Sequence, residues 1–285
     1  MSYRPAKCTV GSKVKSKEIP PLWEFINGFC ENVTESFNER WSKITPEMFD
    51  KHIHEAMGGL LARQATLAIE LARSPMMWNG NVAPLILRCM TDAYITFAWI
   101  LEDIEDRTKK YIEYGLGQEK LFIEYLEEAI REEPDKNYVD RMKSMVEHRK
   151  SWLNAQLAEW ATDVNVGSWS GMPTRDMAKA IGRESIYKFA YVPFSGAAHN
   201  MWQHVGVYNV EQCLNPLHNG HLIPKIRRVP NDPEFLYLAA KYVSQTYELF
   251  DEKLNISIER KLPIEYLLDH PFFNQPSEQS EASDS

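Results

Sequence analysis

Residues 82–101 read VAPLILRCMTDAYITFAWIL, and this stretch decides the fold. It is long and apolar enough to cross a bilayer as a helix. Arg88 and Asp92 interrupt it, however, and each charge would cost roughly 3 kcal/mol at the centre of a membrane. We therefore expect a central core helix in an ordinary soluble globular protein, and no membrane partner.

Apolar residues recur at helical spacing on both sides of this stretch. Trp23, Ile26 and Phe29 begin one such pattern, and Thr45 followed by Pro46 is typical of a helix start. Strand-like alternation is nearly absent. The sequence therefore predicts an all-α multi-helix bundle, with helices over residues 22–41, 46–73, 82–103, 105–132, 136–163, 175–182, 185–206 and 233–258.

Glycine and proline modify this pattern. Gly115 and Gly117 can break or bend the helix over 105–132, and Pro193 can bend the helix over 185–206. Three prolines and Gly220 predict an irregular loop segment over residues 209–232. A single helical domain is expected over residues 22–274, between a flexible basic arm (1–21) and a disordered acidic tail (275–285).

Composition limits the classes of function. The 285-residue chain carries a net charge of −8, which argues against a broad nucleic-acid-binding face and leaves room for a local basic site. Its four cysteines are far apart, and no secretory leader is visible, so we expect the reducing cytoplasm. Phosphate loops, nucleophile elbows and His-Glu-x-x-His metal motifs are absent from the sequence, and no cofactor is predicted.

Arg88 and Asp92 lie four residues apart, so one helix face carries both and they can pair. One interpretation is a structural ion pair that fixes helix register, and the other is the cationic wall of a site. Glu70 is a third charge on an apolar run. It can pair with Arg88 or Arg63, although partial exposure would explain it equally well.

The stretch from 195 to 224 gathers four of the eight histidines. His199 and His204 are five residues apart, so on a regular helix they point about 140° away from each other. Cys213, His218 and His221 form a conceivable three-ligand zinc set. Three interpretations stay open: histidines that hydrogen-bond to loop backbone, a metal site, and general acid–base chemistry.

Four pieces carry a resemblance to a known family: MTDAYITFAWILED, KYIEYGLGQEKLFIEYLE, FAYVPFSGAAHNMWQHVGVYN and CLNPLHNGH. Over residues 53–230 the chain resembles a widespread bacterial family of unknown function. More distantly it resembles the helical HEPN superfamily, whose active members are metal-independent ribonucleases of toxin–antitoxin and phage-defence systems. Their site pairs an arginine with a histidine that follows after four to six intervening residues on one helix, usually at a dimer interface.

The strict HEPN spacing occurs at Arg141 and His148, on a highly charged helix where a chance match is expected. No arginine precedes His199 at that spacing, so its partner must come from another helix, with Arg88 the leading candidate. The resemblance thus implies a ribonuclease or RNA-binding homodimer, with His199 as general base or acid and Arg88 facing phosphate. His204 joins the catalytic set, and the expected supports are Asp92, Glu70, Asn215, His218 and His221.

Two alternatives remain open. One is a non-catalytic helical interaction or regulatory module, with a partner protein of a defence or toxin system. The other is a metal-dependent hydrolase that uses Cys213, His218 and His221.

Overall fold

The computed structural model describes residues 21–45, 50–157 and 168–273. The basic arm predicted for 1–21 lies outside these residues except for Pro21, and so do the acidic tail at 275–285 and the end of the helix predicted for 136–163. Within the described parts the protein is an all-α multi-helix structure with one two-stranded sheet, as the sequence predicts.

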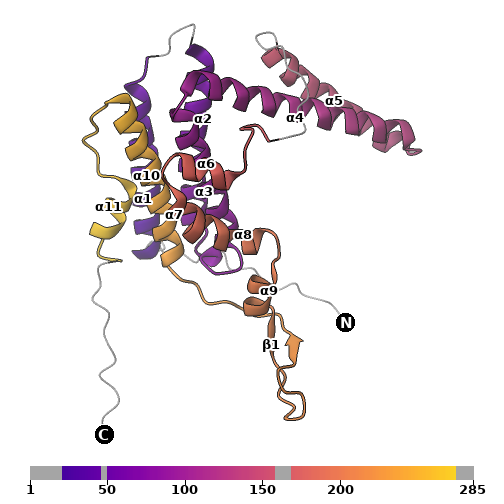
Figure 1. Cartoon of the computed structure of the whole chain (residues 1–285), viewed down its shortest axis with the longest axis vertical. Helices are drawn as coiled ribbons and strands as arrows, with labels where there is room; N and C mark the ends of the chain where they lie inside the picture. Colours follow the sequence, from indigo (N-terminus) through magenta and orange to yellow (C-terminus); the bar gives the residue numbers. More distant parts are fainter. Residues whose placement is uncertain (1–20, 46–49, 158–167, 274–285) are drawn as a thin grey trace, which may run out of the picture.

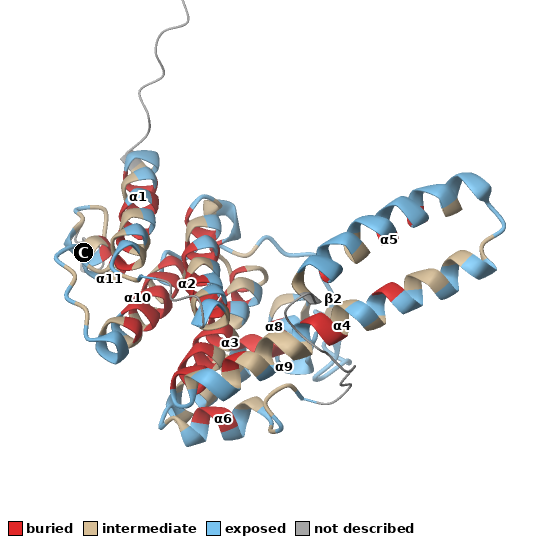
Figure 2. Ribbon diagram, turned by 90° about the horizontal axis from the view of Figure 1, so that it is seen from above, coloured by how far each residue is buried: buried red, intermediate tan, exposed pale blue. Residues whose placement is uncertain are grey.

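Helix α3 (Ala83–Leu101) is the central core helix that the sequence predicts. It packs against α2 (Lys51–Ala72), α8 (Val192–Ala198) and α10 (Glu234–Leu254). Its length and composition would suit a membrane span, but 61% of its most apolar 18-residue window is buried inside the protein. Figure 2 shows α3 and α10 as largely buried elements of the helical body. Apolar packing on several sides thus explains its continuous hydrophobic sequence.

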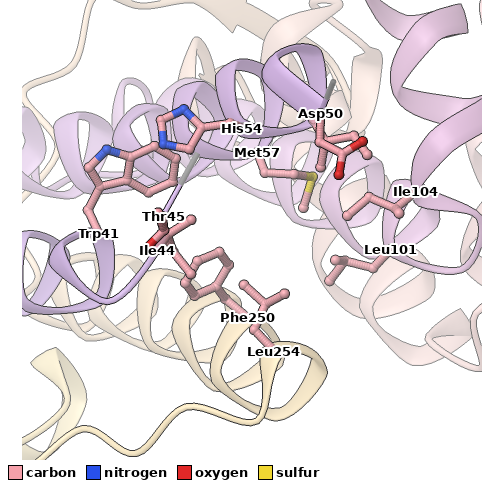
Figure 3. A pocket seen from close by; sticks show the side chains of 11 residues that line it. Trp41, Ile44, Thr45, Asp50, His54, Met57, Leu101, Ile104, Phe250 and Leu254 are labelled. Carbon is pink, nitrogen blue, oxygen red and sulfur yellow. The ribbon is translucent and has the colours of Figure 1, made fainter. Parts of the chain in front are cut away.

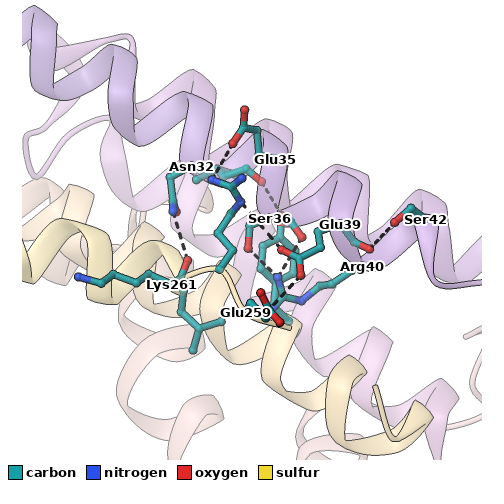
Figure 4. A network of polar contacts seen from close by, with 12 residues as sticks. Asn32, Glu35, Ser36, Glu39, Arg40, Ser42, Glu259 and Lys261 are labelled. Carbon is teal, nitrogen blue, oxygen red and sulfur yellow. Dashed lines mark hydrogen bonds and ion pairs between the residues drawn. The ribbon is translucent and has the colours of Figure 1, made fainter. Parts of the chain in front are cut away.

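Helix α1 (Pro21–Ser42) is held to α10 by a buried arginine. Arg40 is 1% exposed, and its Nε and Nη2 atoms donate hydrogen bonds of 2.9 and 2.6 Å to the carboxylate of Asp251. Its Nη1 donates to the carbonyl and the hydroxyl of Ser36, at 2.9 and 2.6 Å. Figure 4 shows Arg40 and Ser36 of α1 within the polar network of this region, with Glu259 and Lys261 from the C-terminal part of the chain. A buried guanidinium is tolerated here because its donors are partnered.

Helix α11 (Pro263–Asp269), which packs against α1 and α10, has no counterpart among the predicted helices. Proline stands in its first turn, and the Leu262 backbone N–H donates to Glu265 Oε2 at 2.8 Å. These are ordinary helix-start signals, but the helix has only seven residues and a short apolar pattern. The described chain also contains a short 3-10 turn at Pro75–Met77.

Helices α4 (Ile104–Glu132) and α5 (Lys136–Leu157) pair as an arm that extends sideways from the body (Figures 1 and 2). The predicted break at Gly115 and Gly117 is wrong, because α4 runs through both. A small core of Leu116, Ile123, Val146 and Leu153 joins the two helices. This packing stabilises the helical state of α4 and outweighs the low helix propensity of its two glycines.

The single helix predicted over 185–206 is also wrong. The segment consists of α7 (Glu184–Ile186), a π-helical turn η3 (Tyr187–Tyr191), α8, and α9 (Trp202–Tyr208), after a short α6 (Thr174–Ala180). Pro193 lies in the first turn of α8, directly after the π-helical turn. The break comes at Asn200, which has a left-handed φ of 52°.

A Schellman motif closes α8. The N–H of Met201 donates to the carbonyl of Gly196 at 2.9 Å, and the N–H of Asn200 donates to that of Ala197 at 3.4 Å. Asparagine is the commonest residue after glycine at this left-handed position. His199 and His204 therefore lie on different elements, and their relative orientation does not follow from a regular helix.

The irregular segment predicted over 209–232 contains a short antiparallel hairpin. Strand β1 (Val210–Gln212) pairs with β2 (Leu222–Pro224), with Val210 opposite Pro224 and Gln212 opposite Leu222. The remaining described residues of the segment form turns and loops, as predicted. In Figure 1 the hairpin projects beyond α9, away from the arm.

Candidate functional site

Arg88 and Asp92 form the ion pair that their spacing predicts, between Arg88 Nη1 and Asp92 Oδ2. The arginine side chain is 12% exposed and that of the aspartate 45%. Burial raises the pKa of the Asp92 carboxyl above its ordinary value, and the charge and hydrogen bond of Arg88 oppose this shift. The pair therefore lies at the edge of the core, with the carboxylate toward solvent.

Two residues of the π-turn and α8 complete the surroundings of Arg88. Its Nε donates a 2.8 Å hydrogen bond to Ser195 Oγ, and that hydroxyl donates to the carbonyl of Tyr191 at 2.7 Å. The guanidinium carbon lies 3.3 Å from the centre of the Tyr191 ring, a cation–π contact. Arg88, Asp92, Tyr191 and Ser195 are called the Arg88 cluster below.

His199 lies beside this cluster and is exposed. It caps the C-terminal end of α8, where its N–H donates to the carbonyl of Ser195 at 3.0 Å. It is close enough to Asp92 for its charge to lower the pKa of that carboxyl. Asp92 therefore pairs with Arg88 and lies within electrostatic range of His199, the histidine that the sequence predicts as its partner.

His204 lies on α9, half-buried against Tyr208, with ring centres 4.7 Å apart. Burial lowers the pKa of its imidazole, which favours the neutral ring. Its Cβ would lie 3.7 Å from a Cβ placed on Gly196. His204 therefore helps to pack α9 against α8, immediately after the helix that carries His199.

The other predicted supports are not brought to the cluster. Glu70 is exposed on α2 and lies within electrostatic range of Cys30. Asn215, His218 and His221 belong to the hairpin tip with Cys213. Within the described residues, no hydrogen bond or ion pair joins the hairpin tip to Arg88 or His199. The sequence-predicted residues therefore divide between two separate places.

Sequence reasoning missed Tyr191 and Ser195. A signal existed, since Tyr191, Ser195 and His199 recur at intervals of four residues. Such a spacing places side chains on one helix face. The contact partner, Arg88, lies 107 positions before Ser195, and a sequence-local pattern cannot supply that pairing.

A hollow lies near the C-terminal end of α3, away from the Arg88 cluster. Leu101 lines it, about 20 Å along the helix from Arg88 at 1.5 Å per residue. Figure 3 shows the Trp41 ring against His54, whose ring centre is 4.2 Å away. The hollow is mainly apolar and does not share residues with the Arg88 cluster; its lining consists of Trp41, Ile44, Thr45, Asp50, Ile53, His54, Met57, Leu101, Ile104, Phe250 and Leu254.

Comparison with known proteins assigns a family. No curated protein and no solved structure matches the chain. The family of unknown function DUF5677 matches residues 54–213, which is more than half of the chain and includes both Arg88 and His199. The protein therefore belongs to the DUF5677 family.

Proposed function

We propose that the protein is an HEPN-like ribonuclease whose site is composed of the Arg88 cluster and His199. One observation carries the proposal: a largely buried, oriented arginine pairs with Asp92, and an exposed histidine from a distant helix lies within electrostatic range of the same carboxylate. This combination of a fixed cation and a proton-transfer group is what cleavage of a phosphodiester requires.

In the proposed reaction His199 acts as general base toward the ribose 2′-hydroxyl. The 2′-oxygen attacks the adjacent phosphorus, the bond to the 5′-oxygen breaks, and a proton returns to that leaving oxygen. The products are a 2′,3′-cyclic phosphate end and a 5′-hydroxyl end. No metal ion takes part in these steps.

Arg88 supplies the positive charge for the pentacovalent transition state. Ser195, Asp92 and the Tyr191 ring hold its guanidinium. Its Nη2 group makes no hydrogen bond to any described residue, so it can donate to a phosphate oxygen. An arginine that is already oriented loses little entropy when it binds the substrate.

The resemblance to HEPN proteins extends the proposal to the setting. It suggests a cytoplasmic homodimer that cleaves or binds RNA in a bacterial toxin or phage-defence system, with a partner protein and without a membrane. His204 contributes by positioning α9 against α8, as its contact with Gly196 indicates.

The test is cleavage of labelled total RNA by the purified protein in the presence of EDTA. We expect EDTA-resistant cleavage by the wild type and a loss of at least 100-fold, a typical acid–base contribution, in His199→Ala. His148→Ala is the matched control, because His148 belongs to the strict Arg–His spacing on the exposed face of α5. The proposal fails if the wild type does not cleave, or if His148→Ala is the variant that loses activity.

A non-catalytic interaction module is the second candidate, and the α4–α5 arm is the observation that favours it. Exposed aromatic side chains occur along the arm, including Tyr125 at 58% and Trp152 at 51% exposure. Exposed aromatics of this kind are frequent at binding surfaces. This candidate would be favoured if the purified protein does not cleave RNA, whether or not it binds RNA, and if the arm binds a partner protein.

A further inference from the structure

We propose that the tip of the β1–β2 hairpin binds one zinc-class divalent cation through Cys213, His218 and His221. The site is separate from the Arg88 cluster and has no step in the proposed RNA cleavage. The ion has three protein ligands and one position open to water or to a ligand from a partner.

The hairpin backbone brings the three ligands together. The N–H of Cys213 donates to the carbonyl of His221 at 2.8 Å, directly after the last β pair, so these residues face each other across the hairpin. His218 donates its N–H to the carbonyl of Asn215 and accepts at its own carbonyl the N–H of His221, both at 3.0 Å. Gly220, with a φ of 76°, reverses the chain between the two histidines.

The ligand atoms are already close to the geometry of a tetrahedral site. Cys213 Sγ and His218 Nδ1 are 3.6 Å apart, and one ligand atom from each of the three residues lies within 4.8 Å of the other two. Zinc–sulfur and zinc–nitrogen bonds of about 2.3 and 2.05 Å at a tetrahedral angle give a sulfur–nitrogen separation of about 3.6 Å. The Cys213–His218 separation already has this value, and the separations to His221, which are at most 4.8 Å, need only a small adjustment.

The ligand types determine the class of cation. One thiolate with two imidazoles suits zinc and its cobalt(II) substitute, and it disfavours magnesium and calcium, which prefer oxygen. Both histidines are exposed and Cys213 is half-buried, so an ion can enter from solvent. A simple thiol–imidazole hydrogen bond would account for Cys213 and His218, but it would not require the third ligand atom of His221.

Asn215 lies behind His218 and offers a way to tune the site. Its Oδ1 accepts the N–H of Leu217 at 3.0 Å, and its Nδ2 lies 3.3 Å from His218 Nε2. When a cation occupies Nδ1, Nε2 carries the proton and needs an acceptor, which an amide nitrogen cannot provide. A carboxylate at this position would accept both the Leu217 N–H and the His218 Nε2–H. Asn215→Asp is therefore expected to tighten cation binding about tenfold.

The experiment is titration of metal-free, reduced full-length protein with cobalt(II), followed by competition with zinc. We expect one cobalt per chain, a thiolate-to-cobalt charge-transfer band, and displacement of cobalt by zinc. Cys213→Ser should abolish the band, and His221→Ala should weaken binding at least tenfold. Cys89→Ser is the matched control, because Cys89 is an exposed cysteine on α3, and it should leave the band unchanged.

A second measurement does not depend on any substitution. Zinc should protect Cys213 from alkylation while Cys89 stays reactive, as read by mass spectrometry of the modified peptides. Absence of a stoichiometric band, a band that survives in Cys213→Ser, or equal alkylation of Cys213 with and without zinc would overturn the proposal. RNA cleavage by the same samples is a separate readout, so failure of one proposal leaves the other intact.

Discussion

Arg88 is largely buried, and each of its contacts uses a different part of its guanidinium. Nε binds Ser195, Nη1 binds Asp92, and the planar face lies on Tyr191. A lysine could replace the charge, but it could not reproduce the two directed hydrogen bonds and the stacking together. The residue therefore positions α8 on α3 in addition to its proposed role toward phosphate.

Arg88→Lys should consequently reduce the free energy of unfolding by about 1–3 kcal/mol, the range for lost charged hydrogen bonds. Urea denaturation followed by far-UV circular dichroism measures this. Arg131→Lys is a suitable control, because Arg131 is exposed in the last turn of α4 and its substitution should change stability by less than about 0.5 kcal/mol. Equal stability of Arg88→Lys and the wild type would refute the positioning role.

Arg40 makes a stronger prediction because it is 1% exposed. Arg40→Ala would leave the Asp251 carboxylate partly buried without its partner and should cost about 3–5 kcal/mol. Chemical denaturation tests this, and Arg260→Ala is the control, since Arg260 pairs with Glu35 at the surface with 40% of its side chain exposed. Similar losses in the two variants would contradict the account.

At the scale of elements, the break between α8 and α9 depends on Asn200. Its φ of 52° costs a residue with a Cβ roughly 1–2 kcal/mol, although asparagine tolerates it better than most. Asn200→Gly should preserve or raise the thermal midpoint, whereas Asn200→Val should destabilise by about 1–2 kcal/mol. Scanning calorimetry of both variants measures this, and a stable Asn200→Val protein would argue for a continuous helix.

Two buried tyrosines of α10 should lower the stability of the folded protein at alkaline pH. Burial raises the pKa of Tyr242 from 10.0 to about 12, and it raises that of Tyr247 further, with Arg40 opposing. Between pH 10 and 12 the unfolded chain loses a proton from Tyr242 while the folded chain keeps it. The unfolded state then binds fewer protons, so stability falls as pH rises through this window.

The loss attributable to Tyr242 is up to about 3 kcal/mol at pH 12, from 1.36 kcal/mol per pKa unit. Urea midpoints measured from pH 9 to 12 should therefore decline, and Tyr242→Phe should flatten part of the decline. A midpoint that stays constant over this range, or a decline unaffected by the substitution, would contradict the assigned burial.

The elements also show how far the sequence predicts the structure. Helix α3 could be predicted because a helix with apolar residues on several faces is stable only when it is buried in the core. Helix α11 and the end of α8 could not, because seven residues give little periodicity and asparagine is a weak stop signal. The Arg88–Asp92 pair followed from a spacing of four, whereas the contact of Arg88 with Ser195 depends on packing between distant segments.

At the scale of the whole molecule, large apolar side chains are exposed on η3, which carries Tyr191, and on α9, which follows His199. Phe189 of η3 is 81% exposed and Trp202 of α9 is 66% exposed. Exposed aromatics of this size are typical of interfaces, and the proposed HEPN-like function predicts a dimer. We expect light scattering to give twice the chain mass of 33.1 kDa.

Phe189→Glu should convert this dimer to a monomer and reduce RNA cleavage in parallel. Met76→Glu is the control, since Met76 is 64% exposed but lies before α3, in the turn at Pro75–Met77. A wild type that is monomeric at micromolar concentration, or a Phe189→Glu variant that remains dimeric, would contradict the predicted interface.

The central claim is that Arg88 and His199 act together on one phosphodiester. A double-mutant cycle of EDTA-resistant RNA cleavage, with Arg88→Lys, His199→Ala and the double variant, tests it most directly. If the two groups serve one transition state, the double variant should be about as slow as the slower single variant. The claim would be contradicted if the rate loss in the double variant equals the product of the two single losses, or if the wild-type protein does not cleave RNA.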